Sequence, residues 1–264
     1  MNIRKNLKKK YIAYLDVLGF KEIVGKGNLD TLELYFSTVQ DTLEIIRSDK
    51  KNIKSLLISD STILISPDTR EDFRTLVRAV QTIQAKLAQK DIWMRGSISF
   101  GEVYFNRSLN LVVGEGLVKA YLLESEAVQP RVIIDTSIIP KIAENRQDFY
   151  AFMNPHHNNF EGDKVKLIHN WQRYTEDDSF FVAYAHRILL DSIEDRSINL
   201  IYQKIKNKLY SDPKHYKKFL WVKNYFMEVL IDLEQRWEIL SLNSSEEKEN
   251  RLYIKEWWEK FTEL

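Results

Sequence analysis

The chain has 264 residues, of which 44% are hydrophobic and 29% charged, so it can bury the core of one large domain or of two small ones. Its net charge of +1 gives no electrostatic reason to expect binding to nucleic acid or to an anionic membrane. The absence of cysteine excludes disulfides and thiolate zinc sites, and no apolar run approaches the roughly 20 residues that span a bilayer, so we expect a cytoplasmic protein.

Glycine and tryptophan are unevenly distributed along the chain. Seven of the eight glycines lie between Gly19 and Gly116, whereas four of the six tryptophans lie in the last quarter. Turn-forming residues thus dominate the first part, and aromatic residues gather in the second. We expect a first domain over residues 1–153 and a mainly α-helical extension over 154–264, which begins in the polar run 154–163.

The first domain is expected to alternate strands and helices. Runs rich in β-branched residues predict a strand over 11–16 and a hairpin over 54–66. Apolar residues spaced three and four apart predict a helix over 30–47, with Asp30 as its N-cap, and another over 71–89. The remaining elements are, in chain order, strands over 92–104 and 111–113, a helix over 114–127 and a strand over 131–134. This order predicts an α+β fold with helices on one face of a mainly antiparallel sheet, in a ferredoxin-like or palm-type arrangement.

The pattern of the C-terminal part predicts strands over 148–153 and 165–168 and helices over 179–210 and 215–240. In the last of these helices a wide apolar stripe runs along one face and needs a partner. We expect the extension to pack on the first domain or on its copy in a dimer.

Two aspartates stand where predicted strands end. Asp16 closes an apolar run and precedes Gly19, which permits a sharp change of direction, and Asp60 lies at the tip of the predicted hairpin. Neighbouring strands of one sheet can bring the two carboxylates together, and adjacent carboxylates repel unless they share a proton or a cation. Carboxylate oxygens and substrate phosphates are the usual ligands of Mg²⁺, so the pair predicts a magnesium site. The simpler interpretations are a helix N-cap for Asp16 and an ordinary turn residue for Asp60.

Four short segments follow one another along residues 11–135. They are DVLGF, ISDSTILIS, MRGSISFGEV and VGEGLVKAYLLES. Together they resemble the catalytic domain of class III nucleotidyl cyclases, the adenylyl and guanylyl cyclases. The resemblance implies that Asp16 and Asp60 hold one or two Mg²⁺ or Mn²⁺ ions. The implied reaction is attack of a ribose 3′-oxygen on the α-phosphate of a nucleoside triphosphate, with loss of pyrophosphate.

The resemblance is incomplete at three positions. Val118 and Leu122 stand where the family has an Asn and an Arg that orient the ribose and stabilise the phosphates. Leu56 stands at the position of the purine-selecting Lys in the nucleotide site. These departures resemble a divergent branch, the pyrimidine cyclases of the bacterial Pycsar antiphage system, which make cyclic CMP or cyclic UMP. The implied substrate is CTP or UTP, and a separate effector protein would read the product.

The same resemblance implies further site residues. Backbone N–H groups would meet the phosphates, namely those of Val17, Leu18, Gly19 and Phe20. Arg95 is the first choice for the cation that replaces the missing Arg, Lys119 is the second, and Arg131 is a further candidate. In the family the site lies between two protomers, which implies a head-to-tail homodimer with metals from one chain and base contacts from the other.

Simpler interpretations remain open for several of these residues. Arg95 could lie at a strand edge with its aliphatic stem on apolar surface, and Lys119 and Arg131 fit solvated surface positions. Glu124 is interpreted as a solvated helix residue. A second functional hypothesis is a catalytically silent module of the same fold that binds a nucleotide or a protein partner, because Val118 and Leu122 replace the reactive pair. A palm-type polymerase or cyclic-dinucleotide synthase is disfavoured, because the chain lacks a Gly-Gly-Asp-Glu-Phe hairpin.

Overall fold

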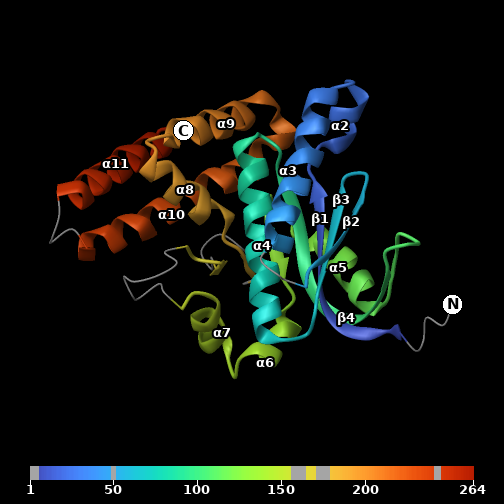
Figure 1. Ribbon diagram of the computed structural model, residues 1–264. Helices are drawn as coiled ribbons and strands as arrows, with labels where there is room; N and C mark the ends of the chain where they lie inside the picture. The colour runs from blue at the N-terminus through green and yellow to red at the C-terminus, as the bar shows by residue number, and fades with distance from the viewer. Residues whose placement is uncertain (1–5, 49–51, 156–164, 171–178, 241–244) are drawn as a thin grey trace. The chain divides into compact units, whose positions relative to one another are not determined.

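A computed structural model describes residues 6–48, 52–155, 165–170, 179–240 and 245–264 (Figure 1). The chain divides into two compact units, Met1–Ala183 and Tyr184–Leu264. The strands of the described residues all belong to the first unit, and the described part of the second unit is helical. The predicted α+β class with a helical C-terminal region is confirmed.

The first unit is built on one sheet in the order β2-β3-β1-β4-β6-β8-β7, with β5 paired to β4 outside this path. The strand β1 (Lys8–Val17) lies between β3 (Ser61–Ser66) and the long β4 (Met94–Asn106). The shorter strands are β2 (Lys54–Ile58), β5 (Leu111–Val113), β6 (Val132–Ile134), β7 (Ile168–Asn170) and β8 (Phe180–Val182). Among the described strands β4 and β6 run parallel and the other pairs antiparallel, so the sheet is mainly antiparallel, as predicted.

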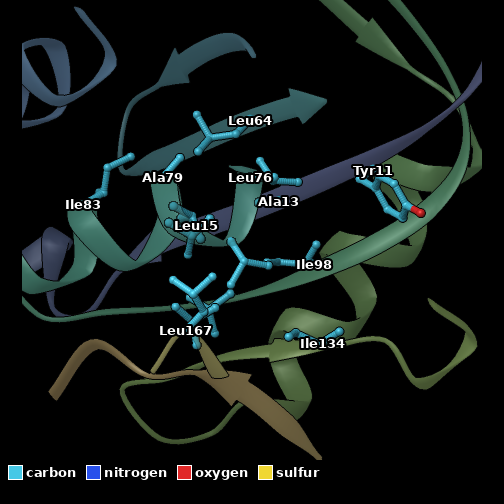
Figure 2. Close-up of a cluster of buried hydrophobic side chains, with 14 of the residues drawn as sticks. Tyr11, Ala13, Leu15, Leu64, Leu76, Ala79, Ile83, Ile98, Ile134 and Leu167 are labelled. Atoms are coloured by element: carbon cyan, nitrogen blue, oxygen red, sulfur yellow. The ribbon is translucent and has the colours of Figure 1, made fainter. Parts of the chain in front are cut away.

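Side chains alternate along β1 and separate the two faces of the sheet. Tyr11, Ala13 and Leu15 point to one face, where they join a hydrophobic core with helices α3 (Leu29–Ser48) and α4 (Arg70–Gln89). Figure 2 shows these three β1 side chains gathered with residues of α4 and of the neighbouring strands. The amphipathic pattern that predicted both helices therefore faces this core, as expected for a helix packed on a sheet.

Helix α5 (Glu115–Glu126) covers the opposite face, so the prediction that the helices lie on one face is wrong. Ile12 of β1 and Ala120 of α5 belong to a second, smaller core on this side. The close approach has a physical reason in β4, where small side chains face α5. Ser97 Oγ donates to the carbonyl of Ala120 at 2.6 Å, and Ser99 Oγ donates to that of Gly116 at 2.7 Å.

Two local predictions fail because polar side chains cap helices at other positions. Helix α3 already begins at Leu29, and Asn28 Oδ1 accepts the N–H of Thr31 at 3.2 Å, so Asp30 lies inside the first turn. Residues 148–153, predicted as a strand, belong to helix α7 (Arg146–Met153). The side chain of the residue before it, Asn145, accepts two backbone N–H groups of its first turn.

Other elements differ in extent from their predictions. The stretch predicted as one helix over 179–210 contains the strand β8 and then two helices, α8 (Tyr184–Glu194) and α9 (Ile198–Ser211). The strand predicted over 165–168 lies at Ile168–Asn170. Short helical segments complete the first unit, namely α2 (Phe20–Gly25), a 3₁₀ turn (Thr136–Ile138) and α6 (Ile139–Ile142).

The second unit consists of α8, α9, α10 (Pro213–Leu240) and α11 (Ser245–Thr262). The apolar stripe of α10 finds its partners inside this unit, because α10 packs against α8, α9 and α11. Phe226 is fully buried there and its ring stacks with that of Phe261 of α11. None of the described helices is long and apolar enough to cross a membrane.

The boundary between the units falls after Ala183, whereas the sequence suggested a boundary after residue 153. The intervening chain belongs to the first unit because β7 and β8 extend its sheet. Gln81 of α4 also donates to the carbonyls of Lys166 at 2.5 Å and Ala183 at 2.9 Å. Asn154 is buried and bonded to β7, while residues 156–163 of the expected linker lie outside the described residues.

Candidate functional site

The candidate site lies where β1 ends beside the turn between β2 and β3. Asp16 is paired with Ser61 in the β1–β3 ladder, and the N–H of Val17 donates to the carbonyl of Asp60 at 3.3 Å. The carboxyl groups of Asp16 and Asp60 lie close enough that Asp60 raises the pKa of Asp16. The structure therefore brings the two carboxylates together, and their role as metal ligands stays a prediction.

The turn between β2 and β3 is short and is contacted by helix α3. Ile58 and Ser61 form the last pair of the hairpin, which leaves Ser59 and Asp60 as a two-residue turn. Ser59 has a φ of 56°, in the left-handed region that costs an ordinary residue about 1–2 kcal/mol. Tyr35 of α3 donates its hydroxyl to the carbonyl of Asp60 at 3.3 Å. Packing of α3 thus fixes the position of the acidic turn.

Burial and negative neighbours dominate the environment of Asp16. Burial raises the pKa of its carboxyl most, the nearby Asp60 and Glu124 raise it further, and Arg95 opposes them; the pKa reaches about 6. Burial is thus the main cause of the raised pKa, and the three carboxylates of Asp16, Asp60 and Glu124 have one guanidinium beside them. A site with this excess of negative charge favours an additional cation.

Arg95 lies between two carboxylates. It stands opposite Asp16 in the β1–β4 ladder, its Nε is 3.7 Å from Asp16 Oδ2, and it makes a closer contact with Glu124 Oε1. Glu124 is only 6% exposed, so its interpretation as a solvated residue is wrong. The spacing Gly116, Ala120, Glu124 marks the buried face of α5, and this was the signal that sequence reasoning missed.

Two of the four backbone N–H groups expected at the phosphates are already engaged. The N–H of Val17 donates to Asp60, and that of Leu18 donates to the carbonyl of Trp93 at 2.8 Å. The remaining backbone N–H groups that could bind a phosphate are those of Gly19, which has a φ of 75°, and of Phe20 at the start of α2.

The other predicted cations have partners elsewhere. Lys119 is 46% exposed and forms an ion pair with Glu115 at 2.6 Å on the outer side of α5. Arg131 is buried, and its Nε donates to the carbonyl of Ala127 at 3.1 Å, where α5 ends. The structure places Arg95, and neither Lys119 nor Arg131, in contact with the carboxylates around Asp16.

Leu56, Val118 and Leu122, which were singled out in the sequence, differ in their exposure. Leu56 packs against the smaller core under α5. Val118 and Leu122 project from α5 and are 56% and 61% exposed, and Tyr121 between them is 57% exposed. Tyr121 also meets the ring of Tyr14 at 5.6 Å. Val118, Tyr121 and Leu122 therefore form an exposed apolar stripe on α5.

The described residues contain no group of three or more His, Cys, Asp or Glu side chains placed to hold a metal ion. A separate pocket of about 240 Å³ is lined by Ile53, Lys54, Ser55, Phe105 and Arg107. Lys54 begins β2, at the end of the hairpin opposite the Asp60 turn, so this pocket includes none of the predicted site residues.

No protein-family model and no curated protein matches the chain. Among solved structures it is similar to the adenylyl cyclase CyaB from P. aeruginosa, with a TM-score of 0.40, 15% identity, and coverage of 52% of this chain and 82% of that one. It is also similar to the guanylyl cyclase Cya2, with a TM-score of 0.43, 14% identity, and coverage of 67% and 91%. A third is the guanylate cyclase domain of RhGC from Catenaria anguillulae in complex with GTP, with a TM-score of 0.39, 15% identity, and coverage of 51% and 82%.

The side chains at the end of β1 define what the site can do chemically. Asp16 and Asp60 supply adjacent carboxylate oxygens, which suit Mg²⁺ or Mn²⁺ when substrate phosphates complete the coordination shell. Arg95 adds a fixed positive charge beside them. Two carboxylates for a divalent cation together with one guanidinium suit a reaction in which phosphate charge develops.

Proposed function

We propose that the protein is a nucleotide cyclase that converts a nucleoside triphosphate to a 3′,5′-cyclic nucleotide and pyrophosphate. The observation that carries this proposal is that Asp16, at the end of β1, lies beside the turn that contains Asp60, with Arg95 next to Asp16. The four segments that resemble class III cyclases place both aspartates at the metal-binding positions of that family. In the reaction the ribose 3′-oxygen forms a bond to the α-phosphorus while the bond from that phosphorus to the pyrophosphate oxygen breaks.

The donor set fits a divalent cation. Asp16 and Asp60 would hold Mg²⁺ or Mn²⁺, because two neighbouring carboxylates in a partly buried site repel unless a proton or a cation lies between them. When bound, the ion supplies positive charge to the triphosphate and lowers the pKa of the attacking hydroxyl. The N–H groups of Gly19 and Phe20 would orient the phosphates, and Arg95 would offset part of the developing negative charge.

The proposed base is a pyrimidine. Leu56 provides no hydrogen bond where the related cyclases read a purine with Lys, and Val118 and Leu122 remove the polar pair on α5. These positions support CTP or UTP as substrate, with a cyclic nucleotide that a separate effector protein reads in antiphage signalling in the cytoplasm.

The proposed active form is a head-to-tail homodimer with composite sites. The apolar stripe of α5, formed by Val118, Tyr121 and Leu122, supports it, because three large apolar side chains on one face of a helix are suited to a protein interface. Metals would then come from one protomer and base contacts from the other.

The test is turnover of each of the four nucleoside triphosphates with Mn²⁺, with products identified by mass spectrometry. We expect cyclic CMP or cyclic UMP with pyrophosphate, and loss of both when Asp60→Ala removes a carboxylate. Asp41→Ala, at an exposed position of α3, is the matched control and retains activity. No product from any of the four nucleotides would contradict the proposed reaction.

A second candidate is a catalytically silent module that binds a nucleotide. Val118 and Leu122 favour it, because both side chains are exposed and apolar at the positions where related cyclases have an Asn and an Arg that act on the substrate. Calorimetry separates the two candidates: the module binds a nucleoside triphosphate tightly in the presence of Mn²⁺ and releases no pyrophosphate. Turnover under the same conditions would exclude it.

A further inference from the structure

The contact between Arg95 and Glu124 sits beside the carboxylate pair and is asymmetric. Arg95 Nε is 3.7 Å from Asp16 Oδ2, close to the outer limit of an ion pair, and it touches Glu124 Oε1 much more closely. Arg95 is 29% exposed, whereas the side chain of Glu124 is 8% exposed. The guanidinium is therefore held mainly by the buried partner and only loosely by Asp16.

Glu124 has little freedom to move, because α5 is fixed to β4 just before it. Ser97 and Ser99 of β4 bond to carbonyls of α5, and Gly116 of α5 lies directly against Gly101 of β4. A carboxylate in a buried position is costly unless a cation pairs with it, and Arg95 is the cation in contact with Glu124. The backbone of α5 thus sets where the carboxylate lies, and the carboxylate sets where Arg95 lies.

Without Glu124, Arg95 would have a different partner available. Asp16 is directly opposite it in the β1–β4 ladder, and a guanidinium beside a carboxylate tends to form a two-point pair with it. Such a pair would occupy the oxygens of Asp16 that the proposed metal site uses. Arg95 and a divalent cation would then compete for the same carboxylate.

We propose that Glu124 is a positioning residue that holds Arg95 away from Asp16 and so keeps this carboxylate available to a divalent cation. This inference rests on the metal site of the proposed function. It assigns no contact between Glu124 and the metal, because Glu124 acts through Arg95.

The test is a double-mutant cycle read by Mn²⁺ affinity, measured by calorimetry on the full chain without nucleotide. Glu124→Gln keeps the size of the side chain and is expected to weaken Mn²⁺ binding about tenfold, as loss of a residue that orients a ligand does. In the Arg95→Met background the same substitution is expected to weaken binding by no more than about threefold, since only a nearby charge is then lost. Arg95→Met alone is expected to tighten binding, because the competing guanidinium is gone.

Controls separate this inference from the metal site itself. Glu115→Gln removes an exposed carboxylate from the same helix and is expected to leave Mn²⁺ affinity unchanged, and circular dichroism verifies that each variant is folded. Equal losses from Glu124→Gln in both backgrounds would overturn the inference and leave the metal site in place. Weaker Mn²⁺ binding by the Arg95→Met protein would also overturn the inference, because it would show that Arg95 does not compete with the cation. Absence of Mn²⁺ binding by the wild-type and Arg95→Met proteins would overturn the metal site and the inference together.

Discussion

The environment of Asp16 disfavours the ionised form of its side chain. Burial, Asp60 and Glu124 all raise the pKa of Asp16, and Arg95 offsets them only in part. The folded protein consequently binds the Asp16 proton more tightly than the unfolded chain does, since the pKa is about 6 in the fold against an ordinary value of 3.8. In the absence of metal the ionised Asp16 therefore reduces stability.

The pH dependence of this effect is testable. The stabilising contribution of protonated Asp16 is fully present below pH 3.8 and is lost as the pH rises through about 6. In a buffer with a chelator, Asp16→Asn is expected to raise the free energy of unfolding by about 2 kcal/mol at pH 8 and to change it little at pH 4. Urea denaturation at both pH values measures this difference. The control Asp41→Asn, at an exposed position of α3, shows no such pH dependence, and an Asp16→Asn effect equal at both pH values would contradict the explanation.

The sequence predicted that Asp16 and Asp60 lie close together, because both stand at the ends of strands with clear β-branched patterns. Once β1 and the β2–β3 hairpin pair, geometry places the two turns together. Sequence reasoning failed for Glu124 because a charged residue is exposed in most helices, and only its position on the buried face of α5 shows otherwise. The partners of Lys119 and Arg131 depend on local contacts that spacing does not specify.

At the scale of elements, the site depends on how closely α5 approaches β4. Gly101 and Gly116 lie face to face, and a Cβ built on Gly101 would be 2.8 Å from both Cα and N of Gly116. Backbone atoms of two fixed elements cannot move apart without separating the helix from the sheet. This contact therefore positions Glu124, and through it Arg95.

Adding one methyl group at this contact is expected to be costly. Gly101→Ala should lower the free energy of unfolding by about 2 kcal/mol, because the helix must shift away from the sheet. Gly25→Ala at the end of α2 is the matched control, since no atom lies within 4 Å of an added Cβ there. Denaturation in urea compares the two variants. Equal stability of Gly101→Ala and wild type would show that α5 adjusts without strain.

Periodicity predicted most elements of the first unit but not the faces that they cover. Apart from the short helix α2, the strands and helices from residue 11 to residue 134 occur in the predicted order, because alternation and helical spacing are local signals. The placement of α5 on the opposite face depends on Ser97, Ser99 and Gly101, whose small size is visible in the sequence but whose direction is not. Residues 179–210 were predicted as one helix because the short strand β8 is a continuous apolar run, which has the same pattern in a strand and in a buried helix.

At the scale of the whole molecule, the chain contains two units whose boundary follows strand pairing rather than composition. The late strands β7 and β8 return to the sheet through β6, as the pairing of Ile133 with Phe181 shows. Composition suggested an earlier boundary because it reports no such long-range pairing. The helices of the second unit meanwhile bury the apolar stripe of α10 among themselves. Within the described residues of the first unit, the exposed apolar stripe on α5 is the surface on which we test the proposed dimer.

Leu122 provides that test, because it is 61% exposed within the apolar stripe of α5. If this stripe joins two protomers, Leu122→Glu buries a carboxylate without a partner in the interface and should convert a dimer to a monomer. Light scattering after size exclusion measures the mass, and nucleotide turnover should fall with it, since a composite site needs both chains. Leu200→Glu, at a 63% exposed position of α9, introduces the same charge outside the stripe and should leave mass and turnover unchanged. A dimeric and active Leu122→Glu protein would show that α5 faces solvent in the assembly, and the composite site would then have to form on another surface.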